Sequence, residues 1–231
     1  MTAGTMLLLA ALFLLLYNRN EDNQAEKVTS EILTELKAQM PELHYKEESS
    51  YPVVSPAESN VTSIYGMVPD LDNTVEIPSE LPAEPDIFAE YDSSAEQTET
   101  VVYYVNDIAY MGILYIPKLG LELPVVSDWS YPGLKAAPCR YTGSAEEGNL
   151  VIAAHNYRCH FGRISELDSG DEIIFTDGNG TVYRYNVVQS EIIGGKNAAA
   201  MLSDPENWDI TLFTCTYSGA SRVTVRAVLA E

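Results

Sequence analysis

The chain has 231 residues and a formal net charge of −21 at pH 7. This length allows one domain with a substantial core plus appended segments, and the strong negative charge argues against nucleic-acid binding. The acidity is uneven: residues 47–100 carry 13 acids and no Lys or Arg, whereas residues 101–231 carry 15 acids and nine bases. The three cysteines, Cys139, Cys159 and Cys215, do not suggest a disulfide framework. A single Cys139–Cys159 bridge stays open.

The first 17 residues, MTAGTMLLLAALFLLLY, contain no charged side chain. As a helix they span roughly 25 Å, slightly less than a hydrocarbon core of about 30 Å. A signal peptide would have a basic region before the apolar run and a small-residue cleavage site, and neither is visible. We therefore predict a transmembrane signal anchor at residues 1–18. Its orientation stays open, since the first basic residue, Arg19, follows the run.

Two different segments follow the predicted anchor. Residues 25–40 have apolar side chains at near-helical spacing before Pro41. These apolar residues are Val28, Ile32, Leu33, Leu36 and Met40. The pattern predicts a membrane-proximal helical stalk over residues 19–46, which we favour over a partner-binding helix. Residues 47–100 contain half of the 12 prolines and no apolar periodicity, which predicts a disordered acidic linker.

From residue 101 onward, short β-rich runs alternate with Gly and Pro. The segment DEIIFTDGNGTVYRYNVVQSEII, residues 171–193, consists of two such runs around Asp-Gly-Asn-Gly, a strong hairpin signal. About seven or eight short strands with few helices indicate an all-β barrel or sandwich. Residues 101–231 are therefore the predicted folded domain.

The stretch ITLFTCTYSGASRVTV, residues 210–225, predicts a second hairpin. If Thr216 faces Ser221 around a four-residue loop, Cys215 lies directly opposite Arg222, with Cβ atoms about 5 Å apart. Side-chain alternation then makes one face a core face. That face holds Ile210, Leu212, Thr214, Val223, Val225 and Ala227, and the less apolar face holds Thr211, Phe213, Cys215, Arg222, Thr224 and Arg226.

A thiol beside a guanidinium has a chemical interpretation. The positive charge favours the nucleophilic thiolate, and the forked donors of Arg222 suit a developing oxyanion. The structural alternative is a small buried Cys215 beside an arginine that lies over the sheet.

A cysteine nucleophile needs a proton shuttle, and the chain has three histidines. His44 precedes the linker, His155 ends the strand NLVIAAH, and His160 lies in the loop NYRCHFGR. A strand-end histidine is more often structural than catalytic, so spacing alone leaves His155 open. A metal site at His155, Cys159 and His160 lacks a fourth ligand and a paired-ligand spacing.

Together these segments resemble the sortases, membrane-anchored cysteine transpeptidases of Gram-positive bacteria. TLFTC (211–215) is similar to the family's Thr-Leu-x-Thr-Cys strand, and Arg222 matches the arginine that opens the next strand. AAHNYRCHFGRISELDSGDEI resembles the family's His loop, and GILYIPKLGLELPVV resembles its opening hairpin. The motifs appear in family order and cover most of residues 110–229.

The resemblance implies an eight-stranded sortase β-barrel with short helices. It makes Cys215 the nucleophile, His155 the acid/base and Arg222 the oxyanion or substrate-positioning group. Arg226 is the less favoured match, and neither a cofactor nor a metal is implied. Ala154 replaces the usual Gly before the histidine. The subclass stays open between class B-like and class D-like.

The resemblance also implies a reaction and a location. Cys215 would attack a Thr–Gly-type bond in a C-terminal sorting signal of a surface protein, and an amine of a peptidoglycan precursor or a pilin lysine would resolve the thioester. The domain would be extracytoplasmic on a single-pass membrane anchor. Two rivals stay open: an exported cysteine peptidase or amidase that hydrolyses wall peptides, and a non-catalytic tethered β-domain in surface assembly.

Overall fold

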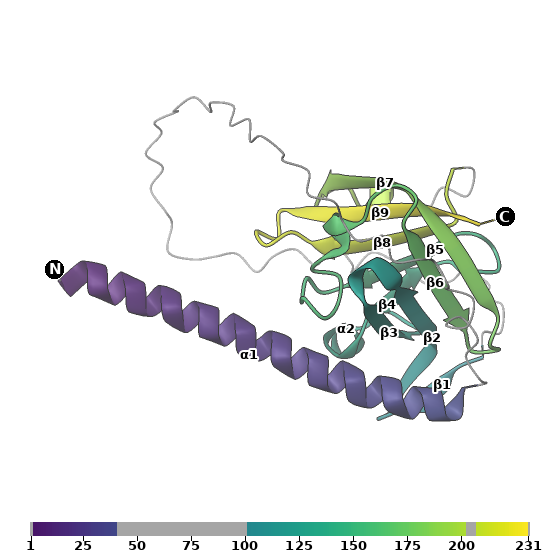
Figure 1. The fold of residues 1–231 in the computed structure, drawn as a ribbon, viewed down its shortest axis with the longest axis horizontal. Coiled ribbons are helices and arrows are strands. Elements are labelled where there is room, and N and C mark those ends of the chain that lie inside the picture. The colour runs from purple at the N-terminus through teal and green to yellow at the C-terminus, as the bar shows by residue number, and fades with distance from the viewer. Residues whose placement is uncertain (1, 41–100, 202–206, 231) are drawn as a thin grey trace, which may run out of the picture.

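The computed structural model describes residues 2–40, 101–201 and 207–230, and Figure 1 shows its elements in chain order. The linker predicted at residues 47–100 lies outside the described residues. The elements are α1 (Thr2–Gln39), β1 (Tyr103–Val105), β2 (Ile108–Ile116), the 3-10 turn η1 (Pro117–Leu119), β3 (Leu121–Val126), α2 (Tyr131–Ala136), β4 (Cys139–Thr142), β5 (Leu150–Ala154), the 3-10 turn η2 (Ile164–Glu166), β6 (Glu172–Asp177), β7 (Val182–Gly194), the 3-10 turn η3 (Ala198–Met201), β8 (Ile210–Cys215) and β9 (Ser221–Leu229).

The strands form one sheet that closes on itself. Its order is β1-β2-β3-β4-β5-β8-β9-β7-β6, and β6 also pairs with β2. The closed ring therefore contains eight of the nine strands, and β1 is added outside it on the edge of β2. This confirms the predicted eight-stranded barrel. Two neighbouring pairs, β3–β4 and β5–β8, are parallel, and the others are antiparallel.

The barrel interior is apolar and fully enclosed. Large side chains from opposite sides of the ring meet there, among them Leu114, Phe175, Tyr185, Leu212 and Val225, each with no exposed surface. Burial of each such side chain stabilises the fold by about 1.5–3 kcal/mol. The barrel closes where β2 meets β6, and a Cβ at Gly112 would lie only 2.2 Å from the Thr176 carbonyl oxygen.

Strand β8 is covered on both faces. Leu212 points into the barrel interior, while Phe213 packs outside it in a second cluster with Val151, Ile193 and Met201. The face that the sequence describes as less apolar is therefore itself buried along most of β8. Because both faces are packed, the strand that ends at Cys215 is held firmly in place.

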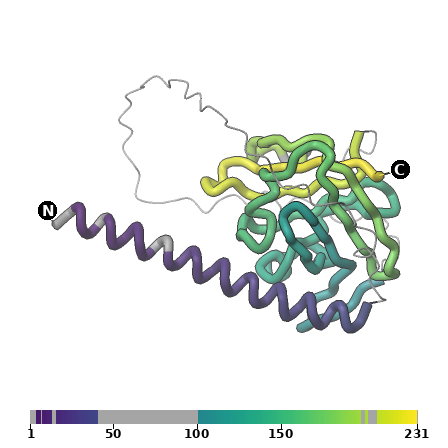
Figure 2. Tube along the Cα trace, viewed as in Figure 1, coloured from purple at the N-terminus to yellow at the C-terminus, as the bar shows by residue number. Residues whose placement is uncertain are grey.

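Helix α1 joins the predicted anchor and stalk into one continuous helix. Its N-terminal half projects beyond the barrel, and its C-terminal half lies along it, past α2 and β1 (Figures 1 and 2). Ile32, Leu36 and Met40 are buried in a cluster with Tyr110 and Val126 of the barrel. Residues 32–40 of the predicted stalk thus share a core with the barrel, and residues 41–46 lie outside the described residues.

The buried face of α1 differs by one position from the predicted pattern. Val28 is 41% exposed, whereas its neighbour Thr29 is 4% exposed and faces the barrel. In the described part of the chain, no helix has both the length and the apolar character to cross a membrane. The anchor at residues 1–18 stays a prediction.

Candidate active site

Three neighbouring strands end at one rim of the barrel, and each carries one of the predicted site residues. The order across this part of the sheet is β5, β8, β9. Ala154 of β5 pairs with Thr214 of β8, so His155 follows β5 where Cys215 ends β8. Cys215 in turn pairs with Arg222 of β9. By strand order Cys215 therefore lies between the other two residues, and the side chains of Cys215 and Arg222 share the outer face of the sheet with Phe213.

The β8–β9 hairpin has the register predicted from the sequence. The Thr216 N–H donates to the Ser221 carbonyl at 2.9 Å and closes a four-residue loop. Gly219 takes a left-handed φ of +73° in that loop, which favours glycine. The core face and the face shared by Cys215 and Arg222 are thus confirmed.

Cys215 is the half-buried thiol at this rim, and all three cysteines are unbridged. The other two thiols are in different environments. Burial raises the pKa of Cys139 to about 12, and burial with the nearby Asp22 charge raises that of Cys159 to about 12. Both are therefore neutral thiols near pH 7 and poor nucleophiles. A Cys139–Cys159 bridge does not form.

His155 is held as a neutral imidazole. Burial, and next the positive charge of Lys135 on α2, lower its pKa from the ordinary value. Its carbonyl accepts from the Phe161 N–H at 3.2 Å, and its ring lies 5.0 Å from the Tyr157 ring between centroids. A neutral imidazole beside a thiol can accept the thiol proton and later return it.

Arg222 is 7% exposed, and only part of its guanidinium is engaged. Its Nη1 donates to the carbonyls of Gly219 at 2.8 Å and Ser221 at 3.2 Å. Its buried Nε has no hydrogen-bond partner among the described residues. A buried charged donor without a partner is costly, and an oxyanion beside Cys215 would satisfy it. Gly195 leaves room here, because a Cβ there would lie 3.2 Å from Nη1.

Arg226 lies on the same face, and its guanidinium binds other groups of the protein. It is 2% exposed, and its Nη1 donates to Thr211 Oγ1 at 2.7 Å. It also donates to the carbonyls of Met201 and Ala200 and lies over the Trp208 ring at 4.7 Å. Arg226 therefore fastens the η3 connection to the sheet.

His160 points away from the strand ends. Its ring has no exposed surface, and its Nε2 lies 2.9 Å from Thr29 Oγ1 on α1. Burial, and next the neighbouring His155, lower its pKa to about 4. Among the described residues, no three His, Cys, Asp or Glu side chains gather to hold a metal ion, so the metal alternative at Cys159 gains no support.

Several residues around His155 were missed by the sequence analysis. Helix α2, which brings Lys135 near His155, had a readable start, since Ser130 caps it by accepting from the Gly133 N–H at 3.1 Å. Thr29 had no comparable signal, because one polar residue on an apolar helix face does not by itself reveal a partner.

Known proteins that are similar to this chain are sortases. The sequence model of the sortase domain matches residues 114–230. Sortase D of Bacillus subtilis (strain 168) is 29% identical over 107 residues, which are 45% of this chain and 53% of that protein. The chain thus spans about half the length of this curated relative.

Solved sortase structures are similar as well. A Sortase D5 transpeptidase from Clostridium perfringens is 20% identical at a TM-score of 0.48, covering 53% of this chain and 79% of that one. Sortase C-3 from Streptococcus pneumoniae is 25% identical at a TM-score of 0.48, covering 55% of this chain and 69% of that one.

Proposed function

Because the chain belongs to the sortase family, whose members are cysteine transpeptidases, we propose that it cleaves a peptide bond through a thioester on Cys215 and passes the acyl group to an amine. The observation that carries the proposal is the order of three strand ends, with Cys215 between His155 and Arg222. The pairing of Ala154 with Thr214 supports the proposal, because His155 and Cys215 follow these two residues although more than fifty positions separate them in the chain.

The first half of the reaction forms the thioester. Neutral His155 takes the thiol proton of Cys215, and the sulfur attacks the carbonyl carbon of the scissile bond. The carbonyl oxygen becomes an oxyanion, which accepts from the unpaired Nε of Arg222. The C–N bond then breaks, the leaving amine takes the proton from His155, and the acyl group stays on sulfur.

The second half restores the enzyme. An acceptor amine attacks the thioester carbon, His155 removes a proton from the amine nitrogen, and the C–S bond breaks. The sulfur of Cys215 leaves with the electron pair and takes the proton back from His155. The products are a new amide and the free thiol.

The substrate, acceptor and location belong to the same proposal. The substrate is a surface protein with a C-terminal sorting signal cut at a Thr–Gly-type bond. The acceptor is an amine of a peptidoglycan precursor or a pilin lysine. The catalytic domain is extracytoplasmic and is attached by a membrane anchor at residues 1–18. The family is membrane-associated in general, which supports this location.

A peptide transpeptidation assay tests the proposal. Sorting-signal peptides with an added amine should give an amide product, and mass spectrometry should find the acyl group on Cys215. His155→Ala should lower turnover by at least about 10²-fold, the effect of losing acid/base help. Hydrolysis without aminolysis would instead identify a peptidase. If the Cys215 thiol does not react with thiol-reactive probes in the native protein, the domain is instead non-catalytic.

A further inference from the structure

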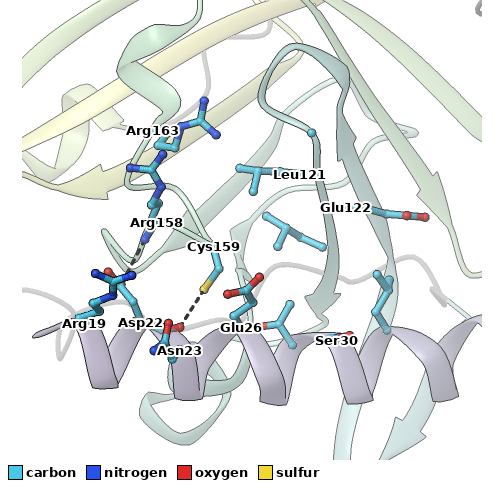
Figure 3. A pocket seen from close by; sticks show the side chains of 14 residues that line it. Arg19, Asp22, Asn23, Glu26, Ser30, Leu121, Glu122, Arg158, Cys159 and Arg163 are labelled. Atoms are coloured by element: carbon cyan, nitrogen blue, oxygen red, sulfur yellow. Dashed lines mark hydrogen bonds between the residues drawn. The ribbon is translucent and has the colours of Figure 1, made fainter.

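Helix α1 holds the loop that carries His155. This loop, residues 155–162, connects β5 to η2 and is named the His loop below. The Arg158 N–H donates to Asp22 Oδ1 at 3.3 Å, and Cys159 Sγ lies 3.8 Å from the Asp22 carbonyl oxygen. Figure 3 shows both contacts reaching from the His loop to α1. His160 adds the third link, to Thr29.

A cavity lies next to these contacts. It has a volume of about 750 Å³ and lies between part of α1 and the barrel (Figure 3). Its lining is mostly polar and includes Arg19, Asp22, Glu26, Arg163 and Cys159. Beside this cavity, the polar contacts of Asp22 and Thr29 link the His loop to the helix.

Thr29 joins three elements at one oxygen atom. Its hydroxyl donates to the Ala136 carbonyl of α2 at 3.1 Å, so its lone pair accepts from Nε2–H of His160 at 2.9 Å. Thr29 therefore binds both elements that flank His155: the His loop, and α2 with Lys135 next to Ala136.

Aromatic rings continue the connection to the candidate acid/base. The ring of His160 lies 5.5 Å from that of Tyr157, and Tyr157 lies 5.0 Å from His155. His160 is fully buried, so its ring cannot turn without moving Thr29 or Tyr157. The orientation of His155 thus depends on a helix that contributes no group to the strand ends.

We propose that Thr29 is a positioning residue for the transpeptidation, which sets the orientation of His155 from helix α1 through His160 and Tyr157. The proposal rests on the proposed function, because it assigns His155 the proton transfers. Docking of α1 then becomes a condition for efficient proton transfer, while the nucleophile stays fixed by the doubly packed strand β8.

The test compares two threonines of the same helix in the full chain. Thr29→Val removes the hydroxyl at nearly constant volume. Thr34→Val is the matched control, because the exposed Thr34 hydroxyl donates to the Ser30 carbonyl of its own helix at 2.8 Å. We expect Thr29→Val to lower kcat about tenfold with KM within about twofold, since small misplacements of catalytic groups are costly. Thr29→Ser should restore kcat, and Thr34→Val should match the wild type.

A second measurement determines the pKa of His155 and does not depend on enzyme turnover. NMR titration of the His155 ring should show its pKa raised toward the ordinary value in Thr29→Val, because a loosened loop admits water. The groups facing His155 are Lys135 on α2, Tyr157 and His160 in its own loop, and Cys215 on β8. Thr29→Val replaces none of these side chains, and only His160 among them loses a bond.

The outcomes separate this proposal from the proposed function. If the wild-type protein forms no thioester on Cys215, the proposed function is refuted. The NMR titration of His155 still decides whether Thr29 acts on His155. A folded Thr29→Val protein with wild-type kcat and an unchanged His155 pKa overturns the positioning role. If Thr29→Val does not fold, Thr29→Ala removes the same hydroxyl, and the same loss of kcat and the same rise of the His155 pKa are required of it.

Discussion

Cys215 and Arg222 are directly paired across the β8–β9 hairpin, and the guanidinium of Arg222 is tied to the hairpin's own loop carbonyls. The β8–β9 hairpin thus positions the Cys215 thiol and the Arg222 guanidinium relative to each other. We therefore expect a substitution at Arg222 to act at this rim more than on the barrel core.

Arg222→Lys should lower the rate of thioester formation by about 10²-fold or more, as expected when a positioned oxyanion donor is lost. A lysine keeps the charge, but it cannot reproduce the fork that binds the loop carbonyls through Nη1 and still offers Nε as a second donor. The measurement is single-turnover mass spectrometry of the acyl-enzyme. A Lys variant with a near wild-type rate would remove Arg222 from the reaction.

Arg226→Lys is the matched substitution on the same strand, and its cost should appear in stability. The lysine loses the bonds to Thr211 and to the η3 carbonyls, together with the contact over Trp208. We expect the free energy of unfolding to fall by about 2 kcal/mol or more. Denaturant titration measures this loss, and the rate per folded molecule should fall less than in Arg222→Lys. The reverse order would contradict the assignment of the two arginines.

The local part of the site could be predicted from the sequence. Alternation of apolar residues in residues 210–225 determines which face Cys215 and Arg222 share, because a shift by one residue would bury the wrong side chains. The proximity of His155 depends instead on the parallel pairing of β5 with β8, which no local pattern encodes. The resemblance to the sortases, rather than sequence periodicity, predicted that His155 lies close to Cys215.

The docking of α1 was not predictable in the same way. The spacing of apolar residues predicted the helix. A free membrane-proximal stalk and a helix packed on the barrel have the same apolar spacing, so the sequence could not distinguish them. What distinguishes them is the polar Thr29 on the buried face, and its partners His160 and Ala136 lie more than 100 residues away. Such long-range pairing appears only once the barrel is assembled.

Cys215→Ala should abolish the acyl-enzyme, whereas Cys139→Ala and Cys159→Ala should retain it. The raised pKa values of Cys139 and Cys159 keep both sulfurs protonated near pH 7. Trapping with peptide substrate, digestion and mass spectrometry locates the acyl group. An adduct on Cys139 or Cys159 in the native protein would overturn the nucleophile.

Truncations should separate the two halves of α1. Deleting residues 1–24 removes exposed apolar side chains and the Asp22 contacts, but none of the helix residues buried against the barrel, and should change the free energy of unfolding little. Deleting residues 1–40 also removes Ile32 and Leu36, whose burial against the barrel stabilises it by about 1.5–3 kcal/mol each. Denaturant unfolding compares the two proteins. Equal stabilities would show that α1 does not contribute to the barrel core in solution.

His160 should make the stability of the protein fall in mildly acidic solution. The unfolded chain protonates this ring near pH 6.5, whereas burial lowers its pKa to about 4 in the folded protein. Between these values the unfolded state binds more protons, so the contribution of His160 is complete above pH 6.5 and is lost as the pH falls toward 4. The loss amounts to at most about 3 kcal/mol.

Comparison with His160→Gln isolates this effect, because the carboxylates titrate in both proteins and cancel in the difference. A glutamine amide can still donate to Thr29 but takes up no proton. The difference in unfolding free energy, wild type minus variant, should therefore decrease steadily from pH 7 to pH 4 and level off below pH 4. A constant difference across that range would mean that the His160 ring protonates as readily in the folded protein as in the unfolded chain.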